Sequence, residues 1–154
     1  MNLDYFALPF GAQLLLWTSR IAINASCRNF PNKYELVDKA YKKVGLKEGL
    51  ILLKDLLAHL RKNKRFKLQS ICSRELIPNE INLINCVEEN KNHKFDNTYY
   101  VKLWSIKNNI PEFSEAVQKL SFSFKHLELN TDIQSIRSNE VITNKEYYRR
   151  LTIH

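Results

Sequence analysis

The sequence is poor in the residues that make turns and crosslinks. It holds only 3 Gly and 4 Pro in 154 residues. All-β folds need such residues at their many turns, so this scarcity favours helices joined by short links. The 3 cysteines, Cys27, Cys72 and Cys86, are odd in number, and no two form a C-x-x-C pair. This excludes a disulfide framework and favours reduced thiols in a cytoplasmic protein.

Long apolar runs are also missing. The longest, from Ala7 to Trp17, contains Gln13 and is soon followed by Arg20. A transmembrane helix needs about 20 mostly apolar residues, so this run is too short to cross a bilayer. The N-terminal residues carry no basic stretch of the kind that begins a secretory signal. We therefore expect a cytoplasmic protein without a transmembrane segment.

The familiar catalytic and cofactor motifs do not occur. No phosphate-binding loop, G-x-S-x-G or H-E-x-x-H is present, and no His lies at metal-ligand spacing from a Cys or another His. The sequence therefore predicts no metal and no cofactor. An enzyme stays open, because catalytic groups can converge from distant positions. Its candidate groups are Cys72, a reactive thiol in an irregular link, and His59, one helical turn after Asp55.

What the sequence does contain is a series of apolar residues at helical spacing. Helices are predicted over about 10–27, 32–44, 46–60, 78–88, 97–108 and 109–127. In the first of these, Phe10 and Trp17 belong to the predicted buried face, and Ser19 and Arg20 to the polar one. Asn32 and Asn109 each begin a capping-box pattern, which predicts side-chain caps for the second and sixth helices.

The third helix has the clearest pattern. Its leucines recur at spacings of four and three, and Ile51 widens the apolar face; these leucines are Leu46, Leu50, Leu53, Leu57 and Leu60. Gly45 suits the residue just past the end of the second helix. Gly49 costs helix stability, so it indicates that a neighbouring helix comes close. Residues 66–72 alternate weakly, which predicts one short strand or an extended link.

These patterns predict an all-α fold. Five to six helices would pack as an irregular bundle around the first, third and sixth. We expect residues 1–130 to form the helical domain and residues 131–154 a C-terminal arm whose order stays open.

The positive charge is concentrated in one segment. The net charge is +8, and residues 33–67 carry eleven Lys and Arg against four Asp and Glu. Lys47, Lys54 and Arg61 are seven apart, so they are predicted to line one exposed strip of the third helix. An alternative explanation is genome composition, because the chain has 16 Lys and 16 Asn. A Lys-rich helix is also often only a solvated face.

The candidate binding residues follow from this charge. They are the strip and its extension, Lys47, Lys54, Arg61, Lys62, Lys64, Arg65 and Lys67, and the aromatic and basic tail, Tyr147, Tyr148, Arg149 and Arg150. Such residues complement nucleic acid or an acidic protein.

The opening Leu8-Pro9-Phe10-Gly11-Ala12-Gln13-Leu14-Leu15-Leu16-Trp17 with Arg20 resembles the start of a group of small uncharacterised helical bacterial proteins. The similarity covers roughly the first 90 residues. It continues through the Leu-rich 50–60, Cys72 and Leu76-Ile77-Pro78-Asn79-Glu80. In that group a second Cys beside prolines often follows, where this chain has Ser73-Arg74-Glu75. The resemblance implies a helical fold and carries no activity.

Three functions remain open. The leading one is a non-catalytic helical module that binds another protein through residues 33–67 or the tail. The second is nucleic-acid binding by the same basic segment, and the third is a small enzyme without a recognisable motif. A homo-oligomer is compatible with all three.

Overall fold

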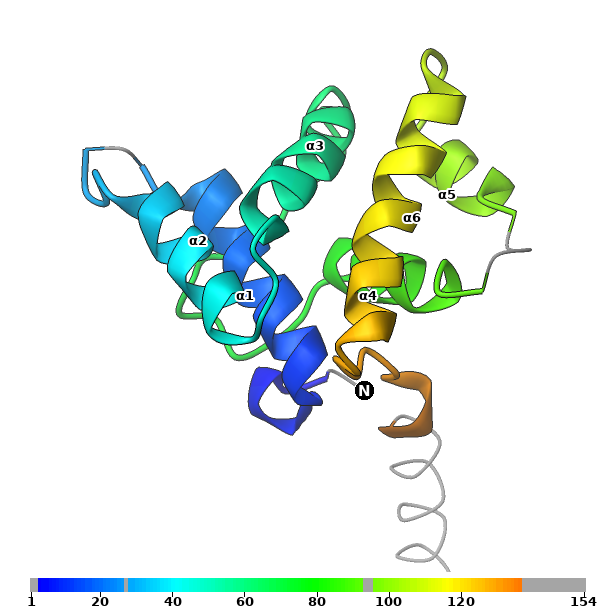
Figure 1. The fold of residues 1–154 in the computed structure, drawn as a ribbon. Coiled ribbons are helices and arrows are strands. Elements are labelled where there is room, and N and C mark those ends of the chain that lie inside the picture. Colours follow the sequence, from blue (N-terminus) through cyan, green and yellow to red (C-terminus); the bar gives the residue numbers. More distant parts are fainter. Residues whose placement is uncertain (1–2, 27, 93–95, 137–154) are drawn as a thin grey trace, which may run out of the picture.

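A computed structural model of the protein describes residues 3–26, 28–92 and 96–136. Among these residues helices are the only regular elements (Figure 1), so the predicted all-α class is confirmed. In chain order they are the 3-10 turn η1 (Tyr5–Ala7) and the helices α1 (Phe10–Asn24), α2 (Lys33–Lys43), α3 (Gly49–Arg61), α4 (Pro78–Glu89), α5 (Thr98–Leu103) and α6 (Ile110–His126).

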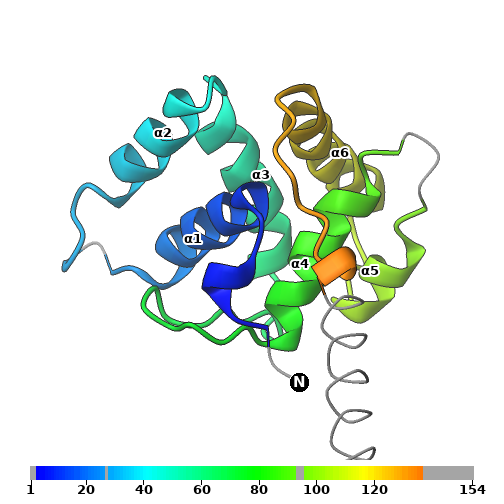
Figure 2. The ribbon, with the colours of Figure 1, turned by 90° about the horizontal axis from the view of Figure 1, so that it is seen from below.

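The helices fall into two groups. Figure 1 shows α1, α2 and α3 on one side and α4, α5 and α6 on the other, and Figure 2 shows the same division from below. The groups are joined where α3 packs on α6 and α1 packs on α4. This is the predicted bundle around the first, third and sixth helices, with α4 as a further central element. Among the described residues, no helix is long and apolar enough to span a membrane.

Helix α1 is buried on more sides than the sequence suggested. It ends at Asn24 rather than near residue 27, and the side chains of Ser19 and Arg20 are buried although they were assigned to the polar face. The reason is that α1 packs on three helices at once, α2, α3 and α4. Phe10 was predicted to point inward, but it is 59% exposed because it lies at the outer edge of the first turn.

The link between α3 and α4 is extended and forms no strand. The amide nitrogen of Asn24 donates to the backbone oxygens of Leu68, at 2.8 Å, and Gln69, at 2.7 Å. One isolated backbone bridge joins Asp4 to Glu75. The link therefore bonds to α1 and the N-terminal segment instead of pairing along its length, and of the two predictions for residues 66–72 the extended link is correct.

The turn between α2 and α3 depends on two glycines. Gly45 has a φ of 91°, the left-handed conformation predicted for a residue just past a helix end. At Gly49 an added Cβ would lie 2.2 Å from the ring of Tyr41, which confirms the predicted close approach. Helix α3 begins at this residue rather than at Leu46. Its leucines Leu53, Leu56, Leu57 and Leu60 are buried, but Ile51 is 69% exposed and does not widen the packed face.

The predicted capping boxes are absent at both asparagines. Asn32 and Asn109 do precede α2 and α6, yet neither side chain caps its helix. Asn109 has a left-handed backbone, with φ of 60°, which differs from the extended backbone usual at a cap. Residue Lys33 is instead buried, and its Nζ donates to the oxygens of Ala22 and Ala25, so it caps the end of α1.

The second half of the chain closes the core. The predicted apolar face of α6 is buried through Phe113, Val117, Leu120 and Phe124. Helix α5 stops at Leu103, short of the predicted 108, because Ser105 has a φ of 52° and ends the helical backbone. After α6, Ile133 is still fully buried, so the chain stays packed on the bundle beyond residue 130. The rest of the predicted arm, residues 137–154, lies outside the described residues.

Candidate functional site

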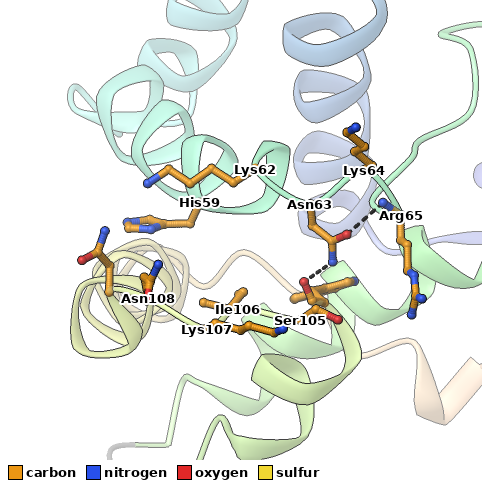
Figure 3. Close-up of a pocket in the computed structure, with 11 residues that line it drawn as sticks. His59, Lys62, Asn63, Lys64, Arg65, Ser105, Ile106, Lys107 and Asn108 are labelled. Carbon is orange, nitrogen blue, oxygen red and sulfur yellow. Dashed lines mark hydrogen bonds between the residues drawn. The ribbon is translucent and has the colours of Figure 1, made fainter.

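A concave surface with several charged side chains is a cleft of about 630 Å³. It opens between the C-terminal end of α3 and the turn that joins α5 to α6 (Figure 3). We call it the basic cleft. Its first wall consists of His59, Lys62, Asn63, Lys64 and Arg65, and its second of Trp104, Ser105, Ile106, Lys107, Asn108 and Asn109.

The first wall is shaped by the way α3 ends. The helix stops at Arg61, and the backbone NH of Arg65 donates to Oδ1 of Asn63 at 2.9 Å, which folds the following residues into a tight turn. Phe66 anchors this turn, because its buried ring meets Trp104 edge to face at 5.6 Å between centroids. The three cations of the turn, at 62, 64 and 65, are thereby held on a fixed backbone while their side chains stay exposed.

The second wall is a turn between two residues with left-handed backbones, Ser105 and Asn109. Trp104 fixes its start, since its ring is 1% exposed and stacks on Tyr100 at 5.4 Å. The turn also brings in a fourth cation, Lys107, from a part of the sequence where no basic cluster was apparent.

Two asparagines tie the walls together. The amide nitrogen of Asn63 donates to the backbone oxygen of Trp104, and Figure 3 marks this bond across the cleft. In addition, the amide nitrogen of Asn79 donates to the backbone oxygen of Arg65 at 2.9 Å, and its Oδ1 accepts from the Trp104 indole at 3.4 Å. The basic cleft is therefore built into the fold before any ligand arrives.

The electrostatics of the basic cleft have one sign. Among the residues that the structure describes, Lys62, Lys64, Arg65 and Lys107 line it and no Asp or Glu does. None of these four cations forms an ion pair among the described residues. A concave surface with charges of one sign focuses the field and attracts ions of the opposite sign. Chemically, the arrangement suits an anion with several oxygen acceptors.

The other candidate residues on the basic segment are placed differently. Lys54 is exposed on α3, but its Nζ lies over the ring of Tyr34 at 4.4 Å from the centroid. Arg61 and Lys67 are exposed and do not line the cleft. Lys47 was predicted to lie on α3 with Lys54 and Arg61. This prediction is wrong for Lys47, because the helix begins two residues after it. Tyr147, Tyr148, Arg149 and Arg150 lie outside the described residues.

The enzyme candidates do not come together. Cys72 is a free, exposed thiol on the link before α4 and does not line the basic cleft. His59 does line it, but its ring packs edge to face on Phe113, at 6.3 Å between centroids. Asp55 lies on the same helix without lining the cleft. Within the described part of the chain, no three His, Cys, Asp or Glu side chains are placed to hold a metal ion.

Cys86 belongs to the core instead. Its side chain is fully buried on α4, and burial raises the pKa of its thiol well above the ordinary value, with the nearby Glu89 adding to the effect. A thiol with a raised pKa is a poor nucleophile, because the thiolate is the reactive form. Cys27 lies outside the described residues.

No protein-family model matches the chain, and no curated protein or solved structure matches it either.

Proposed function

We propose that the protein binds nucleic acid and that the basic cleft holds the sugar-phosphate backbone of an unpaired strand. The observation that carries this proposal is the lining of the cleft, which contains Lys62, Lys64, Arg65 and Lys107 and no carboxylate from the described part of the chain. Phosphate contacts of Lys and Arg supply most of the affinity in sequence-independent nucleic-acid binding.

The size of the cleft supports a flexible strand as the ligand. Its volume of about 630 Å³ lies within the range of sites that enclose a small molecule, so it has room for a nucleotide unit. A duplex is a wide, stiff rod that cannot bend into such a space, whereas a single strand can. The asparagine amides of Asn108 and Asn109 at the rim offer donors and acceptors to a base edge. Trp104 is the one Phe, Tyr or Trp among the described lining residues, and it is buried, so stacking is not part of the proposal.

The proposal includes a cytoplasmic location, because reduced thiols and nucleic acid are both expected there. An acidic protein is the competing ligand for the same cations, because its carboxylates complement them equally well in charge. The two ligands differ in acceptor geometry and in counterion release, and a binding experiment can separate them.

The test is a fluorescence anisotropy titration at low salt. The probes are a labelled single-stranded oligonucleotide of mixed sequence, the same sequence as a duplex, and poly-glutamate of similar length. We expect the single strand to bind most tightly, and the logarithm of its affinity to fall with the logarithm of salt concentration with a slope near −3 for four contacts. Absence of binding at about 10 μM protein would overturn the proposal. Tighter binding of poly-glutamate would do so too and would favour the acidic protein.

A further inference from the structure

A second concave surface lies between α1, together with the N-terminal residues before it, and the C-terminal half of α2. It is a groove of about 300 Å³, and we call it the α1–α2 groove. The residues that line it are Tyr5, Phe10, Gln13, Leu14, Trp17, Ala40, Lys43 and Val44. None of them lines the basic cleft.

The α1–α2 groove is apolar and unusually aromatic for an exposed surface. Trp17 and Val44 are only half-buried, and Phe10 stands at the rim with 59% of its surface exposed. Phe6, a few residues before, is 66% exposed as well. A cluster of large apolar side chains on a strongly charged protein is a typical mark of a protein-binding site.

Hydrogen bonds hold the two sides of the groove in place. The hydroxyl groups of Thr18 on α1 and Tyr41 on α2 are 2.8 Å apart and buried, which fixes the helices relative to each other. On the N-terminal side, the amide nitrogen of Gln13 donates to the backbone oxygen of Leu8 at 3.0 Å, and the Tyr5 hydroxyl donates to that of Gln13 at 3.3 Å. A partner would therefore meet a preformed groove and lose little affinity to ordering it.

The charge at the groove indicates what kind of partner fits. Lys43 is the one charged residue that lines it, and this lysine forms no ion pair among the described residues. We propose that the α1–α2 groove binds an amphipathic helix of another protein, which inserts an apolar side chain between Phe10 and Trp17 and places a carboxylate on Lys43. Grooves between helices recognise amphipathic helices in this manner. A second copy of this chain fits poorly, because two molecules of net charge +8 repel each other.

Trp17 provides the readout. The chain has 2 tryptophans, of which Trp17 lines the groove and Trp104 is buried in the core. Acrylamide quenching therefore reports mainly on Trp17, and a Trp17→Phe variant identifies its signal. The probe is a helical peptide of about 16 residues without aromatic residues, with leucines on one face and glutamates on the other. Its matched control carries lysine in place of every glutamate.

We expect the glutamate peptide to protect Trp17 from acrylamide and the lysine peptide to bind at least about fivefold more weakly. Lys43→Glu should remove this preference. Lys102→Glu, an exposed lysine of α5 with the same change in net charge, should leave it intact. Phe10→Ala should weaken binding about tenfold without a change in helix content, because Phe10 is exposed.

Several results would overturn the proposal. The proposal would be wrong if neither peptide protected Trp17, or if both protected it equally. It would also be wrong if the Phe10→Ala variant bound the glutamate peptide as tightly as the wild type does. Protection that grows with protein concentration, without peptide, would indicate a second copy in the groove. Protection in the free protein at every concentration would indicate that the chain covers its own groove.

Discussion

Nε of Arg20 lies 2.7 Å from Oε2 of Glu80, and both side chains are buried. A second bond joins Nη2 of the arginine to Oε1 of the glutamate at 3.0 Å, so the pair is bidentate. Two further arginine donors bond to the backbone oxygens of Ser73, at 2.7 Å, and Glu75, at 3.2 Å. The ion pair thus joins α1, the extended link and α4 in the interior of the protein.

The carboxylate of Glu80 is satisfied on its other sides as well. Its Oε2 accepts from the backbone NH of Gln69 at 3.1 Å, and its Oε1 accepts from that of Ile77 at the start of α4, also at 3.1 Å. A buried ion pair is tolerable only when its remaining donors and acceptors are paired in this way. Loss of either side chain leaves the other charge buried without a counterion and leaves several hydrogen-bonding groups without a partner.

Glu80→Gln should therefore destabilise the fold strongly. The amide cannot neutralise Arg20 and offers one acceptor where the carboxylate offers two. We expect a loss of about 3–5 kcal/mol in the free energy of unfolding, measured by urea denaturation. Glu75→Gln is the control, because that side chain is exposed, and it should change the free energy by less than about 0.5 kcal/mol. A Glu80→Gln protein as stable as the control would mean that the ion pair does not hold the link.

The sequence alone could predict the helices but not this pair. Periodicity located α3 and α6 because each buries one regular apolar face against its neighbouring helices. The same periodicity placed Arg20 on the polar face, because a polar residue in an amphipathic helix normally faces solvent. Its burial depends on Glu80, 60 residues later in the chain, and on backbone oxygens of an irregular link. The spacing of apolar residues within one helix does not indicate contacts between residues so far apart in the chain.

Leu53→Ala should cost about 2–5 kcal/mol of stability, because Leu53 is fully buried in α3 and its truncation leaves a cavity. Ile51→Ala tests the same helix from the outside. Ile51 was predicted to pack but is 69% exposed, so its loss should be nearly neutral. Thermal unfolding followed by far-ultraviolet circular dichroism compares the two, and both variants should keep a helix-dominated spectrum. Equal melting temperatures would contradict the placement of α3.

The two described cysteines should differ sharply in reactivity. Cys72 is exposed and Cys86 is buried with a raised pKa. Alkylation at neutral pH, with sites mapped by mass spectrometry, should modify Cys72 readily and Cys86 only after denaturation. Cys72→Ser removes the fast reaction and serves as the control for the assignment. Early labelling of Cys86 in the folded protein would show that α4 opens or is packed differently.

Tyr41 should make the fold sensitive to alkali. Burial raises the pKa of its hydroxyl above the ordinary value of 10.0, and the hydrogen bond with Thr18 opposes this only in part. Because the folded-state pKa is the higher one, this contribution to stability is complete below pH 10 and is lost as the pH rises further. Unfolding by urea should therefore become easier above about pH 10. Tyr41→Phe, measured alongside, should show a weaker decline, and an identical decline would contradict this assignment.

The cleft illustrates a second limit of the sequence. The run Lys62, Lys64 and Arg65 was evident as a charge cluster, and the structure places all three in one wall. Lys107 was not recognised, because it is a single lysine in a neutral stretch, 42 residues after Arg65. Its place depends on the left-handed backbone at Ser105, which ends α5 early. The signal for that conformation was weak, since serine has no special preference for it.

The last prediction separates the basic cleft from the basic segment as a whole. Two double variants are compared. The cleft variant carries both Lys62→Glu and Arg65→Glu, and the α3 variant carries both Lys54→Glu and Arg61→Glu on the exposed face of that helix. Both pairs lie within residues 33–67 and change the net charge equally. If phosphates bind in the cleft, the cleft variant lacks two cations that touch them, whereas the α3 variant lacks only long-range attraction. At about 1.4 kcal/mol per charged hydrogen bond, the cleft variant should bind a single-stranded oligonucleotide about 100-fold more weakly.

The salt dependence gives an independent measure of the same cations. Removing one cation that neutralises a phosphate should reduce the slope against salt by about 0.7 for a single strand, so the slope of the cleft variant should fall by about 1.4. The α3 variant should keep the wild-type slope. At about 0.15 M salt, where exposed charges more than about 8 Å apart are largely screened, it should bind less than about threefold more weakly. All four side chains are exposed, so circular dichroism should confirm unchanged folding in both variants. Equal weakening in the two variants would mean that nucleic acid is attracted by net charge alone, and the lysines would then reflect composition rather than a site.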